Sequence, residues 1–471
     1  MMQNADILIT HAHLLSMQGE GVGYIADGAV AVRGSRIVGV GSTESILQQF
    51  TSEQQIDATG CVVLPGLINA HIDTSLALVR GVAQDIQHWL MQGILPYLLQ
   101  MTPAAEVAST QLSVLQGLRT GTTTFVDNNA ISPSWGDWYA EVGVRAVLAP
   151  RFDALPPDMP DMSPDALYPL DVQAGRKALT EAVDFAGHWQ GAAEGRITTQ
   201  LGPYAADMLP SELLREVKQV AQQTGLRVHL HVAQGTRETD QIRQRYGKRP
   251  IALLAEYGLL DEQLLAVHLT DATPDEVRQV AASGASMVLC AGMIGMIDGL
   301  VPPAQPFRQA GGAVALGSSY PNLFREMQTA ALLHKIHHQD PTVMPAWDVL
   351  RMATIEGARA IGLEDQIGSI ETGKQADLIC VDLQTLSLAP TILEPIRNLV
   401  PNLVYSATGN EVKHVMVAGR FLLKDDQLLV ADETAILAEA QRQAEQLSQR
   451  ILTETEYKNL ALIQAMQQQK L

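Results

Sequence analysis

His71 and Asp73 stand two residues apart in the stretch LPGLINAHIDTSLALVRG, residues 64–81. The apolar run CVVL and a Pro-Gly turn precede them, so we expect them at the end of a strand. Because strand side chains alternate with a period of two, both would point the same way. A histidine and a carboxylate placed in this way could share a divalent metal ion. Two histidines are the commoner pair for this geometry, so the carboxylate is unusual.

Other polar side chains also end strand-like runs along the chain. In an α/β barrel, chemistry collects at the C-terminal ends of the strands, which makes such residues candidates for a site. These candidates are Asp127, Tyr204, His229, His231, His268 and the triplet Ser318, Ser319 and Tyr320.

The chain divides into stretches that differ in their predicted secondary structure. Residues 1–62 are short strand-like runs with glycines, which predict a small β unit. Residues 63–362 alternate strand-like runs such as TTTFVD and LLAVHLT with helical stretches, and their length suits a (β/α)8 TIM barrel. Strand-like runs appear again over 363–432, so we predict that both termini form one discontinuous small β-sandwich domain. Residues 433–471 predict a polar, C-terminal helical extension.

Composition and charge exclude several classes of protein. A 471-residue chain with 46% hydrophobic and 18% charged residues is typical of a well-packed globular protein. A net charge of −19 argues against nucleic-acid or anionic-membrane partners. Three widely spaced cysteines and an N-terminus without a basic and then apolar pattern favour the cytoplasm. No run approaches the roughly 18 apolar residues of a membrane helix.

Several segments together resemble the amidohydrolase superfamily, in particular the branch of S-adenosylhomocysteine deaminases and triazine hydrolases of the atrazine chlorohydrolase type. VVLPGLINAHIDTSLALVRG is similar to the family's first-strand segment and LRTGTTTFVDN to its second. RVHLHVAQ and LLAVHLTDATPDEV resemble strands that carry site histidines, and MATIEGARAIGLEDQIGSIETGKQADLICVDL resembles the C-terminal block. The resemblance covers nearly the whole chain and implies a homo-oligomeric enzyme with a small-molecule substrate.

The resemblance also implies a ligand set, which this chain matches only in part. The family holds one metal with a His-x-His on strand one, a histidine on strand five and an aspartate on strand eight. His71 and His231 match the first and third ligands, and His268 matches a histidine that faces the substrate. Asp73 stands where the second histidine belongs, and Ser319 stands where the aspartate belongs.

Two further replacements alter proton handling. Gln234 replaces a substrate-binding glutamate, and Tyr204 replaces a common histidine. In the resembling enzymes the strand-eight aspartate and the glutamate carry protons to the leaving group and the ring. A serine hydroxyl is neither an anionic ligand nor a base near neutral pH, and glutamine releases no proton. A general base must then come from His268, Asp73 or Asp298.

We therefore predict His71, His231 and Asp73 as metal ligands, and His268 and Asp73 as catalytic residues. His229 is expected behind the site, and for Arg151 an inter-strand salt bridge is favoured over binding of a substrate carboxylate. His11 and His13, in the N-terminal β unit, are expected at the surface. The predicted substrate-binding residues are Asp85, Trp89, Tyr204, Gln234, Ser319 and Tyr320.

Three functions remain open at this point. The first is a hydrolase of a C–N or other C–heteroatom bond in a small heterocyclic or amide-like compound, with one divalent metal. Zinc is the first choice, with iron or manganese as alternatives. The second is a metal-independent isomerase, lyase or hydrolase that uses His268, Asp73 and Tyr320, because Asp73 and Ser319 replace usual ligands. The third is a catalytically silent homologue that binds a ligand.

Overall fold

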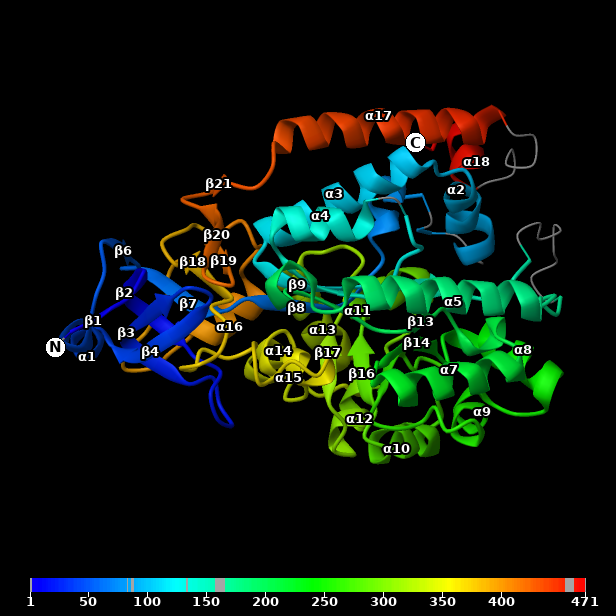
Figure 1. The fold of residues 1–471 in the computed structure, drawn as a ribbon, viewed down its shortest axis with the longest axis horizontal. Coiled ribbons are helices and arrows are strands. Elements are labelled where there is room, and N and C mark those ends of the chain that lie inside the picture. Colours follow the sequence, from blue (N-terminus) through cyan, green and yellow to red (C-terminus); the bar gives the residue numbers. More distant parts are fainter. Residues whose placement is uncertain are drawn as a thin grey trace.

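A computed structural model describes residues 2–82, 84–85, 89–132, 134–156, 166–453 and 461–470 (Figure 1). Two four-stranded parallel sheets form its centre. Their strands follow one another in chain order within each sheet, and nearly every residue in them is buried. The first sheet contains β8 (Leu67–Ile72), β9 (Thr122–Asp127), β10 (Arg145–Leu148) and β12 (Ile197–Thr199), and the second contains β14 (Val228–Val232), β15 (Leu264–His268), β16 (Ser286–Leu289) and β17 (Val314–Leu316).

Backbone and side-chain contacts join the two sheets at both edges. At one edge the His229 backbone N–H donates to the Leu201 carbonyl at 2.8 Å, beside a parallel bridge between Leu201 and Val228. At the other, the Asn69 amide exchanges two hydrogen bonds with the Ser318 backbone, at 2.8 and 2.9 Å. This order of eight parallel strands is consistent with the predicted (β/α)8 barrel. The short strands β11 (Arg151–Phe152) and β13 (Gly202–Pro203) pair beyond the ends of β10 and β12.

Helices between the strands cover the sheets with apolar faces. On α7 (Ser211–Thr224) the buried residues are Leu213, Leu214, Val217 and Ala221, the spacing of one helical face. Thr273 and Glu276 form a capping box at the start of α10 (Pro274–Ala282). The other helices of the barrel region are α2 (Leu95–Leu99), α3 (Pro103–Arg119), α4 (Trp135–Val142), α5 (Val172–Trp189), α6 (Ala192–Gly195), α8 (Gly235–Tyr246), α9 (Pro250–Glu256), α11 (Ala291–Ile297), α12 (Ala304–Gln309), α13 (Leu323–His338), α14 (Ala346–Met352) and α15 (Ile355–Ala360), with η1 (Thr74–Val79), η2 (Trp89–Ile94) and η3 (Ala206–Met208).

Both ends of the chain contribute to one nine-stranded mixed sheet, beside the barrel in Figure 1. Strand β7 from the N-terminal part pairs antiparallel with β18 from the C-terminal part, which joins the two halves. The sheet thus joins an N-terminal and a C-terminal part of the chain, whereas the small β-sandwich domain stays a prediction. Its strands are β2 (Ile7–Leu15), β3 (Tyr24–Arg33), β4 (Arg36–Ser42), β6 (Gln54–Asp57), β7 (Cys61–Pro65), β18 (Leu378–Asp382), β19 (Val412–Val417), β20 (Arg420–Lys424) and β21 (Gln427–Leu428), with α1 (Thr43–Gln49), α16 (Leu399–Tyr405) and the pair β1 (Gln3–Asn4) and β5 (Phe50–Thr51) nearby.

The C-terminal helix α17 (Glu433–Thr453) packs along α3 and reaches α2, with α18 (Ala461–Gln467) after it (Figure 1). Arg119 and Glu433 form an ion pair at its start, and the Arg450 Nε–H donates to the Gln100 carbonyl at 3.1 Å near its end. Leu447 and Ile451 join an apolar cluster with residues of η1 and η2. The extension therefore supports segments that lie over the barrel. Within the described ranges, no helix combines the length and apolar character needed to cross a membrane.

Candidate active site

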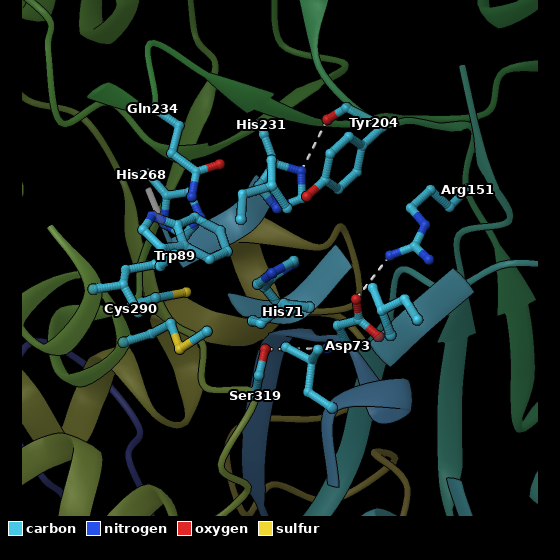
Figure 2. Close-up of a pocket in the computed structure, with 16 residues that line it drawn as sticks. His71, Asp73, Trp89, Arg151, Tyr204, His231, Gln234, His268, Cys290 and Ser319 are labelled. Carbon is cyan, nitrogen blue, oxygen red and sulfur yellow. Dashed lines mark hydrogen bonds and ion pairs between the residues drawn. The ribbon is translucent and has the colours of Figure 1, made fainter. Parts of the chain in front are cut away.

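A pocket opens where the C-terminal ends of β8, β14, β15 and β17 meet, and Figure 2 shows its lining. One wall is apolar and comes from η1, η2, α2 and α11, while three histidines, an ion pair and other side chains form the remainder. The lining residues are His71, Asp73, Leu76, Trp89, Leu90, Ile94, Leu98, Arg151, Tyr204, His231, Gln234, His268, Cys290, Met293, Ile297 and Ser319.

His71, His231 and His268 lie together in this pocket, each offering a ligand atom within 4.8 Å of the other two. The Nδ1 of His71 is 2.8 Å from the Nε2 of His229, which confirms that His229 lies behind the site. The Nδ1 of His231 lies 2.9 Å from the Tyr204 carbonyl, to which it donates when protonated. Each contact leaves the Nε2 of His71 or His231 available to a metal, because a second partner fixes the tautomer.

Burial keeps these imidazoles uncharged. Desolvation lowers the pKa of His231 to about 4 and that of His229 to about 3. Desolvation, followed by repulsion from neighbouring imidazoles, also holds the pKa values of His71 and His268 well below their usual range. Neutral imidazole is the form that binds a metal. The cluster is thus chemically prepared to act as a set of nitrogen ligands.

Asp73 faces a different partner. Its Oδ2 accepts a hydrogen bond from the Arg151 Nη1 at 2.8 Å, and its Oδ1 accepts from the Ser75 backbone N–H at 3.0 Å and from the Ser75 hydroxyl. Asp73 therefore caps η1 and is paired with Arg151, which confirms the predicted inter-strand salt bridge. The structure brings Asp73 into the pocket, but not into the group of three histidines.

Ser319 and Gln234 both line the pocket. The Ser319 Oγ accepts a 3.3 Å hydrogen bond from the Asp73 backbone N–H. Gln234 follows β14 by two residues at the N-cap of α8, and its backbone N–H donates to Glu238 at 2.8 Å. Its amide side chain remains directed into the pocket in Figure 2. Both residues can bind a substrate through hydrogen bonds.

Of the predicted substrate-binding residues Asp85, Trp89 and Tyr320, only Trp89 is among the residues that line the pocket. Trp89 lines the pocket, and its indole N–H donates to Asp298 at 3.0 Å. Asp85 is exposed and lies outside the lining. The Tyr320 hydroxyl accepts from the Gln84 amide at 2.5 Å and is also outside the lining. The structure therefore does not bring Tyr320 together with His268 and Asp73.

The sequence interpretation missed the buried carboxyl groups of Glu238 and Glu326, whereas Asp127 was among its strand-end candidates. Desolvation raises the pKa of Glu326 to about 7 and that of Glu238 to about 8. Glu326 accepts from the Gly292 backbone N–H at 3.1 Å, and Asp127 accepts from Trp135, Tyr139 and Thr74. These side chains hold loops at the ends of the strands. Glu238 and Glu326 lie within the helices α8 and α13, where the sequence gave no signal that distinguished them from surface acids.

A family model, the amidohydrolase family, matches residues 62–422. The chain belongs to the amidohydrolase family. This assignment confirms the resemblance, and the pocket lies at the C-terminal ends of the strands, where α/β barrels hold their sites.

Among the relatives of this amidohydrolase is a 5-methylthioadenosine/S-adenosylhomocysteine deaminase from Pelotomaculum thermopropionicum. It is 34% identical over 455 residues, which cover 95% of this chain and all of the relative. Deaminases are hydrolases of C–N bonds other than peptide bonds, the class predicted above.

Solved structures agree with this relationship. An adenosine deaminase from Xanthomonas campestris with bound zinc is 29% identical, with a TM-score of 0.86, and 95% of this chain covers all of it. An atrazine chlorohydrolase from Arthrobacter aurescens is 20% identical with a TM-score of 0.82, over 93% of this chain and all of the other. At that identity the second likeness concerns the fold alone.

Proposed function

We propose that this chain hydrolyses a C–N bond of a small heterocyclic compound, with deamination of an adenosine derivative as its reaction. The observation that carries this proposal is a cluster of three uncharged histidines beside a carboxylate in one pocket of an amidohydrolase-family barrel. Named relatives of nearly full coverage act on 5-methylthioadenosine, S-adenosylhomocysteine and adenosine, which supports the substrate class.

The residues present fit a divalent metal, with zinc as first choice. His71 and His231 present neutral imidazoles whose other nitrogens have partners, which is the usual environment of metal-binding histidines. When bound, such a metal would lower the pKa of a water molecule and so supply a hydroxide nucleophile near neutral pH. Asp73, a predicted ligand, lies beside this cluster and is better placed to handle protons.

Protein side chains supply binding and proton transfer. Among the lining residues that the structure describes, Asp73 is the only carboxylate, so we assign its Oδ2 the proton that water releases, which it returns to the amino group as this leaves as ammonia. Arg151 holds this oxygen in place at 2.8 Å. Gln234 binds the edge of the heterocycle by hydrogen bonds, and Trp89 with the apolar wall excludes water from the reacting carbon.

We propose that this chemistry takes place in a barrel domain of residues 63–362. The composite β domain of 1–62 and 363–432 and the extension of 433–471 remain proposals, as do a homo-oligomer and a cytoplasmic location. The metal-independent alternative loses support because Tyr320 contacts Gln84 instead of the pocket.

The test is release of ammonia from 5-methylthioadenosine, S-adenosylhomocysteine and adenosine by protein loaded with zinc, manganese or iron. We expect turnover of at least one compound, abolished by a chelator and restored by the metal. Asp73→Asn is expected to reduce kcat by about 100-fold or more, because the proton acceptor is lost. Absence of turnover with every compound and metal would support the silent homologue instead.

A further inference from the structure

We propose that the metal of this chain is held by three histidines, His71, His231 and His268, without a carboxylate ligand. This inference rests on the proposed function and deepens it by naming the ligand set. It departs from the ligands that the sequence predicts, because His268 takes the place given to Asp73.

Spacing of the three rings supports this set. Their centroids are 4.9 Å apart for His71 and His231, 5.2 Å for His231 and His268, and 5.9 Å for His71 and His268. A tetrahedral zinc ion with nitrogen ligands at about 2.1 Å separates imidazole centroids by about 5 Å. The rings therefore need only a small inward adjustment to share one ion.

His268 has an unused nitrogen where a ligand is needed. It is 3% exposed, and its Nδ1 has no hydrogen-bond partner among the residues that the structure describes. A buried polar atom without a partner costs free energy, so it requires an explanation. The backbone at His268 has φ of 82°, in the left-handed region uncommon for residues other than glycine. This conformation ends β15 with the ring beside His71 and His231.

Asp73 differs from His268, because its side-chain oxygens already have hydrogen-bond partners. Both of its oxygens are engaged, Oδ2 by Arg151 and Oδ1 by Ser75. Coordination of a metal by Asp73 would break the ion pair with Arg151, whose side chain is only 19% exposed. Leaving a guanidinium without its partner in such a place is costly. Figure 2 shows Asp73 turned toward Arg151, while the imidazoles of the cluster lie on its other side.

The same arrangement requires no acid at position 319. A serine hydroxyl is a weak ligand near neutral pH, and the one at Ser319 is 3.3 Å from the Asp73 backbone N–H. Three neutral imidazoles satisfy the three protein ligands of a catalytic zinc site and leave one position open. The unusual residues at 73 and 319 are then compatible with a working metal centre.

The experiment compares His268→Gln with Asp73→Asn in the full-length protein, using Zn²⁺ alone and Co²⁺ alone as probes. Asparagine at 73 keeps the Oδ1 that caps η1, so it is a matched control. We expect one ion per wild-type chain, affinity for Zn²⁺ at least about 100-fold weaker in His268→Gln, and affinity within threefold of wild type in Asp73→Asn. Circular dichroism checks that both variants fold.

A second readout reports the ligands of the bound ion directly. X-ray absorption of the wild-type zinc protein is expected to show three imidazoles, and Asp73→Asn is expected to leave that spectrum unchanged. Wild-type affinity in His268→Gln, or a carboxylate ligand lost in Asp73→Asn, would overturn the three-histidine set while leaving the proposed function intact. A wild-type chain that binds neither ion overturns this inference, whereas absence of turnover by a protein that binds them overturns only the proposed function.

Discussion

The two sides of the pocket differ in what their polar atoms already contact. On one side, His71, His231 and His268 are uncharged and keep nitrogen atoms for a ligand. On the other, Asp73 and Arg151 satisfy each other at 2.8 Å. A side chain that looks like a ligand in the sequence is available to a metal only when its own neighbours leave it free. This division between available ligands and engaged ones can be broken by substitution on either side.

The largest expected effect comes from the histidine side. His231→Asn should lower ammonia release by about 1,000-fold or more, because a ligand of the ion that activates water is lost. His188→Asn, at an exposed position of α5, is the matched control and should stay within twofold of wild type. Steady-state kinetics with measured metal content decide the result. Turnover above one tenth of wild type in His231→Asn would contradict the division.

Substitutions at the ion pair of Asp73 and Arg151 should change chiefly the free energy of unfolding. Arg151→Met removes the partner of Asp73 within a partly buried pair, so the free energy of unfolding should fall by about 3 kcal/mol. Urea denaturation measures this change. In the double variant with Asp73→Asn the loss should be smaller than the sum of the single losses, because no charge is left unpaired. Strict additivity would show that the two side chains do not interact.

Acid should lower the free energy of unfolding of the metal-free protein, because its buried histidines must be protonated. His231 has a pKa of about 4 in the fold against 6.5 when unfolded, so its contribution is complete above pH 6.5 and is lost as pH falls toward 4. Between pH 7.5 and 5, His231→Gln should lose about 2 kcal/mol less stability than wild type. Glu238 and Glu326, with raised pKa values, act with the opposite sign, so only this difference is diagnostic. Equal losses of stability in His231→Gln and in the wild type would refute the lowered pKa of His231.

The smallest effect is expected at Ser319. Ser319→Ala removes one long hydrogen bond to the Asp73 backbone, so affinity for Zn²⁺ should change by less than about threefold. Isothermal titration with the zinc ion measures it. A tenfold or greater loss would make the Ser319 hydroxyl a ligand and would place both sides of the pocket around the metal.

The sequence predicted much of the fold and the location of the site. Alternating strand-like and helical runs predicted parallel strands, and the polar residues at strand ends predicted which side chains would meet. His71, His231 and His268 do meet, and Gln234, Tyr204 and Ser319 line the same pocket. Tyr320 failed this expectation because its hydroxyl turns to Gln84, a contact 236 residues away along the chain.

The sequence by itself determined the residue types, and therefore that a serine and a glutamine stand where the family resemblance implies acids. The tertiary structure decided which atoms are free. The engagement of Asp73 depends on Arg151, which lies 78 residues later, and the protonation of the histidines depends on their burial. Periodicity reports the face on which a side chain lies, whereas hydrogen bonding and desolvation depend on neighbours that only the folded barrel supplies.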